Sequence, residues 1–124
     1  MSRTFTHRVS LIMLFCMGFL IYPTNISAQN CDKPTGLNVT NISNFSATLN
    51  WALDTNVDHY RLRYKEAGSS SWLFVFNPIG GSHDISNLVS TATYIWQARA
   101  FCSPGSSPSS NWSIAWHQLL PPQE

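Results

Sequence analysis

Apolar and polar residues alternate along several short stretches of this chain. The clearest alternation runs through residues 92–102, where apolar side chains recur at every second position: Tyr94, Trp96, Ala98, Ala100 and Cys102. A period of two is the spacing of side chains on one face of a β-strand. The large Trp96 beside two alanines suits a packed interior, in which side-chain volumes must match. The row therefore predicts the inner wall of a β protein rather than a reactive site.

The same alternation, interrupted by turn residues, continues through the rest of the chain. It predicts seven short strands, at residues 35–42, 46–51, 59–65, 72–76, 82–88, 92–102 and 112–118. None of these stretches shows the apolar period of a helix, and about a hundred residues in this pattern favour two antiparallel sheets packed as a sandwich. In the third strand, Tyr60, Leu62 and Tyr64 are expected to point inward.

The first 28 residues differ from the remainder. A basic start is followed by an uncharged apolar run and then by small residues before Gln29, a pattern typical of a secretory signal peptide. The alternative is an uncleaved membrane anchor, but the run is short for a bilayer, which needs about 20 apolar residues. We therefore predict a signal peptide at residues 1–28, one domain at 29–120, a tail at 121–124 and no stable membrane insertion after cleavage. The expected location is extracellular, at the cell surface or periplasmic.

Charge and cysteine content narrow the function classes. After residue 28 the chain has five Lys and Arg residues against six Asp and Glu residues, which gives a net charge of −1. Nucleic-acid binding is not expected, because it requires a basic excess that neutralises phosphates. The two remaining cysteines, Cys31 and Cys102, form an even pair in an exported protein, for which a disulfide is the default expectation.

The ordered set of strands resembles a fibronectin type III domain. The residues that carry the resemblance are Pro34, Leu37, Trp51, Tyr60, Leu62, Tyr64, Leu88 and Tyr94. The resemblance covers about residues 31–118 and implies a seven-strand, immunoglobulin-like all-β sandwich. It also implies that Tyr94 donates or accepts a hydrogen bond with nearby backbone, as in the corner that precedes the sixth strand of such folds. The expected core consists of Leu49, Trp51, Tyr60, Leu62, Leu88, Tyr94 and Trp96.

The resemblance bears on the cysteines as well. Cys31 and Cys102 are similar in position to the pair that closes one end of exported bacterial modules of this family. The chain lacks Arg-Gly-Asp in its 103–111 loop, so integrin binding through that motif is not expected. Residues 112–117 resemble the Trp-Ser-x-Trp-Ser motif of cytokine receptors only loosely, because the second Trp comes one position late.

Residues capable of catalysis are present but scattered. His83 and Asp84 are neighbours, so on a strand their side chains point to opposite faces. The sequence has no Gly-x-Ser-x-Gly nucleophile motif and no metal-ligand spacing such as His-Glu-x-x-His or Cys-x-x-Cys. We therefore expect no enzyme activity, no metal and no cofactor.

Two surfaces are candidates for binding. The first is the outer face of the third and sixth strands, where Arg61, Arg63, Arg99 and Phe101 are expected together; the alternative is a solvated face whose Arg stems cover apolar groups. The second is the apolar stretch Trp72-Leu73-Phe74-Val75-Phe76, with Trp72, Phe74 and Phe76 as contact residues at a sheet edge. Its alternative is local burial.

These observations predict a secreted, non-catalytic module that mediates protein–protein or cell-surface interaction, or serves as a spacer or accessory domain. Its partner is expected to be another protein or a cell-surface component. The alternative is a carbohydrate-binding accessory module of an exported polysaccharide-degrading system, with Trp72 and Trp112 as the first residues to test.

Overall fold

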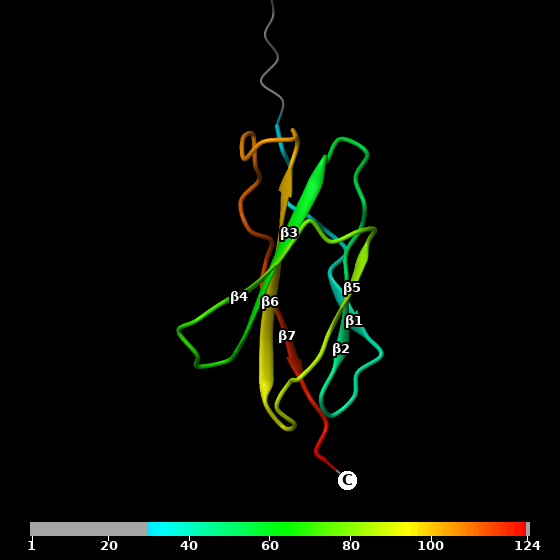
Figure 1. The fold of residues 1–124 in the computed structure, drawn as a ribbon, viewed down its shortest axis with the longest axis vertical. Coiled ribbons are helices and arrows are strands. Elements are labelled where there is room, and N and C mark those ends of the chain that lie inside the picture. Colours follow the sequence, from blue (N-terminus) through cyan, green and yellow to red (C-terminus); the bar gives the residue numbers. More distant parts are fainter. Residues whose placement is uncertain (1–29, 124) are drawn as a thin grey trace, which may run out of the picture.

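The computed structural model describes residues 30–123, which form two antiparallel sheets (Figure 1). The predicted signal peptide lies outside these residues. The three-stranded sheet has the order β1-β2-β5, with β1 at Asn38–Thr40, β2 at Ala47–Asn50 and β5 at Ser82–Ile85. The four-stranded sheet has the order β4-β3-β6-β7, with β3 at His59–Glu66, β4 at Leu73–Phe76, β6 at Thr93–Phe101 and β7 at Trp116–Leu119. The described residues thus form the predicted seven-strand sandwich.

The core lies between the two sheets and follows the alternation of the sequence. Strand β6 is buried at every second residue from Tyr94 to Ala100, and β3 contributes Tyr60 and Leu62 from the same side. All seven residues expected in the core are buried: Leu49, Trp51, Tyr60, Leu62, Leu88, Tyr94 and Trp96. Both sheets therefore place their alternate apolar side chains in one shared interior.

The longest pairing joins β3 to β6. Eight residue pairs run from His59 opposite Phe101 to Glu66 opposite Tyr94. On the inner side, this register sets Leu62 against Ala98 and Tyr60 against Ala100, so that large side chains meet small ones. The same register determines which residues share the outer face of the sheet.

Six of the seven strands are shorter than the sequence pattern predicts, β3 is one residue longer, and the last strand begins later. Residues 112–115, expected in a strand, run beside β6 without regular strand structure. The buried hydroxyls of Ser110 and Ser113 accept hydrogen bonds of 3.0 Å from the backbone N–H groups of Ala100 and Ala98. Because side-chain oxygens replace main-chain carbonyls there, the strand ladder starts only at Trp116.

Tyr94 forms the expected contact with the chain just before β6. Its hydroxyl oxygen accepts a 3.0 Å hydrogen bond from the backbone N–H of Val89. The ring is buried beside Leu88 in the core. The bond ties the turn that precedes β6 to the strand itself.

The predicted disulfide is present. Cys31 and Cys102 are bonded, with Cα atoms 5.7 Å apart and 71 positions of sequence separation. The bond joins the segment before β1 to the chain just after β6. It closes one end of the sandwich, as the resemblance to exported modules implied.

We expect the Tyr94→Phe substitution to lower the free energy of unfolding by about 1 kcal/mol, because it removes one hydrogen bond while keeping the ring. Urea unfolding followed by tryptophan fluorescence measures the change. Tyr64→Phe is the matched control, since the Tyr64 hydroxyl forms no hydrogen bond with the described residues. Equal effects of the two substitutions would contradict a stabilising role for the corner.

We expect loss of the disulfide, in a Cys31→Ala and Cys102→Ala double variant, to lower the free energy of unfolding by up to about 4 kcal/mol. The bond restricts the unfolded chain over a long loop. Urea unfolding of the wild-type protein and the double variant measures the loss of stability. Separately, non-reducing mass spectrometry of the exported wild-type protein should find a mass two hydrogens below that of the form with two free thiols. Two alkylatable thiols in the native protein would refute the bond.

Candidate functional site

The outer face of the four-stranded sheet carries an unusual set of side chains. The register of β3 places its odd-numbered residues on this face, opposite those of β6, while β4 adds its even-numbered aromatics. We call this set the cation–aromatic face, and it consists of Arg61, Arg63, Lys65, Trp72, Phe74, Phe76, Arg99, Phe101 and Trp112. The structure thus brings together, on one surface, the two candidate regions that sequence analysis treated separately.

Arg63 lies at the centre of this face between two indole rings. Its guanidinium carbon is 4.3 Å from the centroid of Trp72 and 4.2 Å from that of Trp112. The Nε and Nη2 atoms donate to the side-chain oxygen of Gln97. Stacking and hydrogen bonding together hold the guanidinium in one orientation, which a lysine could not reproduce.

Trp112 reaches this face because of the irregular segment before β7. The two serine hydroxyls that bind β6 keep the segment close to the sheet, and the backbone N–H of Ser113 donates to the carbonyl of Ala98 at 2.8 Å. Trp112 then lies 6.3 Å, centroid to centroid, from Phe74 of β4. Sequence analysis named Trp112 only as a carbohydrate candidate. The Ser110 and Ser113 pattern could have indicated a side-chain-bonded segment, but its contacts depend on the fold.

Phe101 does not belong to the accessible part of this face. It was predicted as a partner-binding residue, yet only 2% of its surface is exposed. The ring of His59 stacks on it at 4.6 Å, and the guanidinium carbons of Arg61 and Arg99 lie 5.0 and 5.5 Å from its centroid. The prediction of direct contact is therefore wrong for Phe101, because neighbouring side chains cover the ring.

Arg61 and Arg99 face each other directly across β3 and β6. Like charges in this position repel. Arg99 donates to the Ser110 carbonyl at 2.7 Å and to the Ser109 hydroxyl at 2.7 Å, whereas the Arg61 guanidinium lies over the rings of Phe76 and Phe101 and forms no hydrogen bond with the described residues. Arg61 therefore keeps guanidinium N–H groups free to donate to an acceptor from outside.

The face has no internal counter-charge. Within residues 30–123 the salt-bridge contact is between Asp58 and His59, and no carboxylate pairs with Arg61, Arg63, Lys65 or Arg99. Partial burial, followed by the charge of Arg99, lowers the pKa of Arg63 below its ordinary value. Four of the five cations that follow residue 28 thus gather on one face without an acidic partner.

The edge of the face at β4 exposes large apolar side chains. Phe74 and Phe76 are 47% and 62% exposed, and their rings lie 6.1 Å apart with an interplanar angle of 25°. Leu73, which points to the other side of the sheet, is also exposed, while Val75 packs against the core. The β3–β4 hairpin projects from the side of the sandwich (Figure 1), and Leu73, Phe74 and Phe76 of β4 are exposed, whereas Val75 is half-buried.

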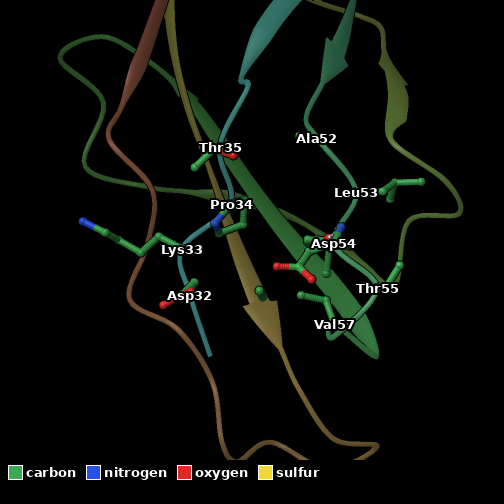
Figure 2. A pocket seen from close by; sticks show the side chains of 11 residues that line it. Asp32, Lys33, Pro34, Thr35, Ala52, Leu53, Asp54, Thr55 and Val57 are labelled. Atoms are coloured by element: carbon green, nitrogen blue, oxygen red, sulfur yellow. Dashed lines mark hydrogen bonds between the residues drawn. The ribbon is translucent and has the colours of Figure 1, made fainter. Parts of the chain in front are cut away.

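A separate depression of about 280 Å³ lies at the disulfide end of the sandwich. The segment 32–35 forms one wall and the β2–β3 loop forms the other (Figure 2). Asp54 comes from the loop, and Lys33 points away from the depression in Figure 2. Burial raises the pKa of Tyr60, whose hydroxyl accepts a hydrogen bond from the Asp54 backbone N–H. These contacts anchor the loop, and they do not align a base with a nucleophile.

The residues with catalytic potential are dispersed in the structure. Asp84 accepts a hydrogen bond from the Thr48 hydroxyl, and His83 stands opposite Leu49 in the β2–β5 pairing. In the part of the chain that the structure describes, no cluster of three His, Cys, Asp or Glu residues could hold a metal ion. No helix in that part is long and apolar enough to cross a membrane.

Comparison with known proteins agrees with this architecture. The family model described as fibronectin type III domain matches residues 32–116. The chain belongs to the fibronectin type III family. Domains of this family generally act as non-catalytic interaction or spacer modules, and the described residues have the family's two-sheet sandwich. A search of curated proteins finds no match.

Solved structures show the same fold at low sequence identity. A myokine structure is 20% identical with a TM-score of 0.61, covering 74% of this chain and 99% of the other. A computationally redesigned β-sandwich protein is 17% identical with a TM-score of 0.64, covering 77% and 100%. The FN1–FN3 domains of chicken CNTN1 are 21% identical with a TM-score of 0.61, covering 74% and 31%. At these identities the likeness concerns the fold alone.

We expect Arg63→Lys to lower the free energy of unfolding by about 1–2 kcal/mol, because a lysine loses the planar stacking between two indoles and the paired bonds to Gln97. Urea unfolding measures the loss, and the tryptophan emission should shift to longer wavelength as Trp72 and Trp112 become more exposed. Arg61→Lys is the control, since Arg61 forms no hydrogen bond with the described residues. A loss as large for Arg61→Lys would contradict the central role of Arg63.

Proposed function

We propose that this fibronectin type III domain is an exported, non-catalytic module that binds another protein through its cation–aromatic face. The observation that carries the proposal is the gathering of Arg61, Arg63, Lys65 and Arg99 among aromatic rings, with no carboxylate of residues 30–123 paired to any of the four. Arginine and large aromatic residues are the side chains most enriched in the energetically dominant parts of protein interfaces.

Export is supported by two features of the chain. Residues 1–28 have the order of basic, apolar and small residues that signal peptides show. The Cys31–Cys102 disulfide suits an oxidising compartment, where such bonds form and persist. In an extracellular, cell-surface or periplasmic location, the cation–aromatic face would be accessible to other exported proteins.

The face is also organised in advance of binding. Arg63 is held by two rings and by Gln97, and Arg99 is held by the segment that follows β6. Side chains that are already ordered lose less conformational freedom when a partner binds. A partner would therefore meet a largely rigid surface with Phe74, Phe76 and the free guanidinium of Arg61 at its accessible side.

The same contacts count against the carbohydrate-binding alternative. Sugar rings stack on flat, open aromatic surfaces, but Trp72 and Trp112 both turn a ring face to the Arg63 guanidinium. Lys65 also lies 4.8 Å from the Trp72 centroid. The protein-binding function is therefore the better supported of the two.

Site-specific photo-crosslinking tests the proposal in the cells that produce the protein. We expect a photoreactive amino acid at position 76 to form a discrete adduct with another protein, whereas the same group at exposed Thr40, on the opposite sheet, should not. Adding Arg61→Gln should reduce the adduct at position 76 by about tenfold, which corresponds to one charge-assisted hydrogen bond. Arg61→Gln is suited to this test because it leaves the hydrogen bonds of the described residues intact.

Two results would contradict the proposal. One is equal crosslinking from positions 76 and 40, which would mean that the face has no preference for a partner. The other is retention of the exported protein on insoluble polysaccharide that is lost in Trp72→Ala or Trp112→Ala variants. That second result would favour the carbohydrate alternative.

A further inference from the structure

Strand β4 forms one edge of the four-stranded sheet. Its hydrogen bonds to β3 leave the main-chain groups of two residues pointing away from the sheet, at the open edge. The backbone N–H of Asn77 donates to the carbonyl of Tyr60, so Asn77 points its main-chain groups toward β3. In an antiparallel pair these groups alternate between the partner strand and the opposite side. Val75 and Leu73 therefore also face β3, whereas the N–H and C=O groups of Phe74 and Phe76 face the open edge.

This edge is short, but it lacks three other features that prevent strand pairing. Edge strands of natural proteins are commonly protected by charged residues, prolines or bulges. Residues 72–76 contain neither a charge nor a proline, and β4 pairs with β3 in unbroken register from Leu73 to Phe76. Because Leu73 on one side of β4 and Phe74 and Phe76 on the other are exposed, an additional strand would find room above and below the sheet for its side chains.

The charge beside the edge indicates what such a strand should carry. The guanidinium of Arg61 lies between the rings of Phe76 on β4 and Phe101 on β6, with its carbon 4.8 and 5.0 Å from their centroids. An added strand would lie about 4.8 Å from β4. An acidic side chain on that strand, opposite Phe76 and on the same face, would approach the guanidinium that lacks a counter-charge.

We propose that β4 binds an extended, acidic segment of the partner protein as a fifth strand of the sheet. The main-chain groups of Phe74 and Phe76 provide the hydrogen bonds, and Arg61 selects a Glu or Asp in the segment. The inference rests on the proposed protein-binding function and adds the form and the charge of the ligand. It assigns β4 the role of a strand-addition site.

A second copy of this chain fits the edge less well. Pairing of β4 with its own counterpart would bring together two apolar strands that have no acidic residue between positions 72 and 76. The charge of Arg61 would stay uncompensated in such a pair. An acidic segment satisfies both the open backbone groups and the charge, so it is the occupant that the observations favour.

The test uses a synthetic peptide, Thr-Val-Glu-Val-Glu-Val-Thr, blocked at both ends, and the isotopically labelled mature protein. In a nuclear magnetic resonance titration we expect shifts of the Phe74 and Phe76 amide signals and slower hydrogen exchange of both amides in the bound state. The same peptide with Lys in place of each Glu should bind at least about tenfold more weakly, because its positive charges repel the cations of the face.

A pair of variants separates strand addition from contact with the face alone. Phe74→Pro removes an N–H that points to the open edge and leaves the bonds to β3 in place, and proline is tolerated at edge strands. Phe74→Leu removes the ring but keeps the N–H. We expect Phe74→Pro to weaken peptide binding by about tenfold relative to Phe74→Leu, since one main-chain bond is lost. Unfolding curves confirm that both variants are folded.

The possible failures are distinguishable. Equal binding by Phe74→Pro and Phe74→Leu, or shifts without protection of the two amides, would overturn strand addition while leaving the face as a binding surface. Equal binding of the Glu and Lys peptides, or no binding of either, would overturn the acidic ligand. Concentration-dependent dimerisation that protects the Phe74 and Phe76 amides without peptide would assign the edge to a second copy. Loss of position-76 crosslinking preference in the producing cells would instead refute the proposed function.

Discussion

The register between β3 and β6 is the constraint on which the rest of this structure depends. A single set of eight residue pairs places Leu62 and Ala98 in the interior and, one position along, Arg61 opposite Arg99 on the exterior. A shift by one residue would reverse both faces, moving guanidinium groups into the core. The burial of Trp96 and Leu62, with about 1% or less of each exposed, makes that shift very unfavourable. The core therefore enforces the placement of four cations on one surface.

Repulsion among those cations is offset by aromatic rings rather than by carboxylates. Arg63 lies between two indoles, and Arg61 and Arg99 share the covered ring of Phe101. Ring faces attract cations and are hydrophobic, so they stabilise the arginine stems without cancelling the charge toward solvent. The result is a stable surface that keeps its attraction for an external acidic group. Because the rings stabilise the arginines without neutralising them, the charge of the face remains available to a partner. This is the physical basis of the proposed binding function.

The two edges of the four-stranded sheet, at β7 and at β4, differ in whether their main-chain groups can bind a partner. At β7 the preceding segment is held to β6 through the Ser110 and Ser113 hydroxyls, and Trp112 covers the sheet. At β4 the backbone of Phe74 and Phe76 stays open, and Val75 is the residue of this strand that packs against the core. An interaction through main-chain groups is therefore available at β4, next to the charge that would give it specificity.

Local patterning in the sequence determined the order of the strands, the inward row from Tyr94 to Ala100 and the core residues, whereas the Cys31–Cys102 pair followed from the number of cysteines after residue 28. The physical reason is that side-chain alternation in a strand depends only on neighbouring residues. The tertiary structure alone decided that Phe101 is covered, that Trp112 stacks on Arg63, that residues 112–115 leave the strand ladder and that the edge expected at residues 72–76 lies beside the guanidinium of Arg61. Each of these depends on contacts between segments far apart in the chain, for which an alternating pattern contains no information.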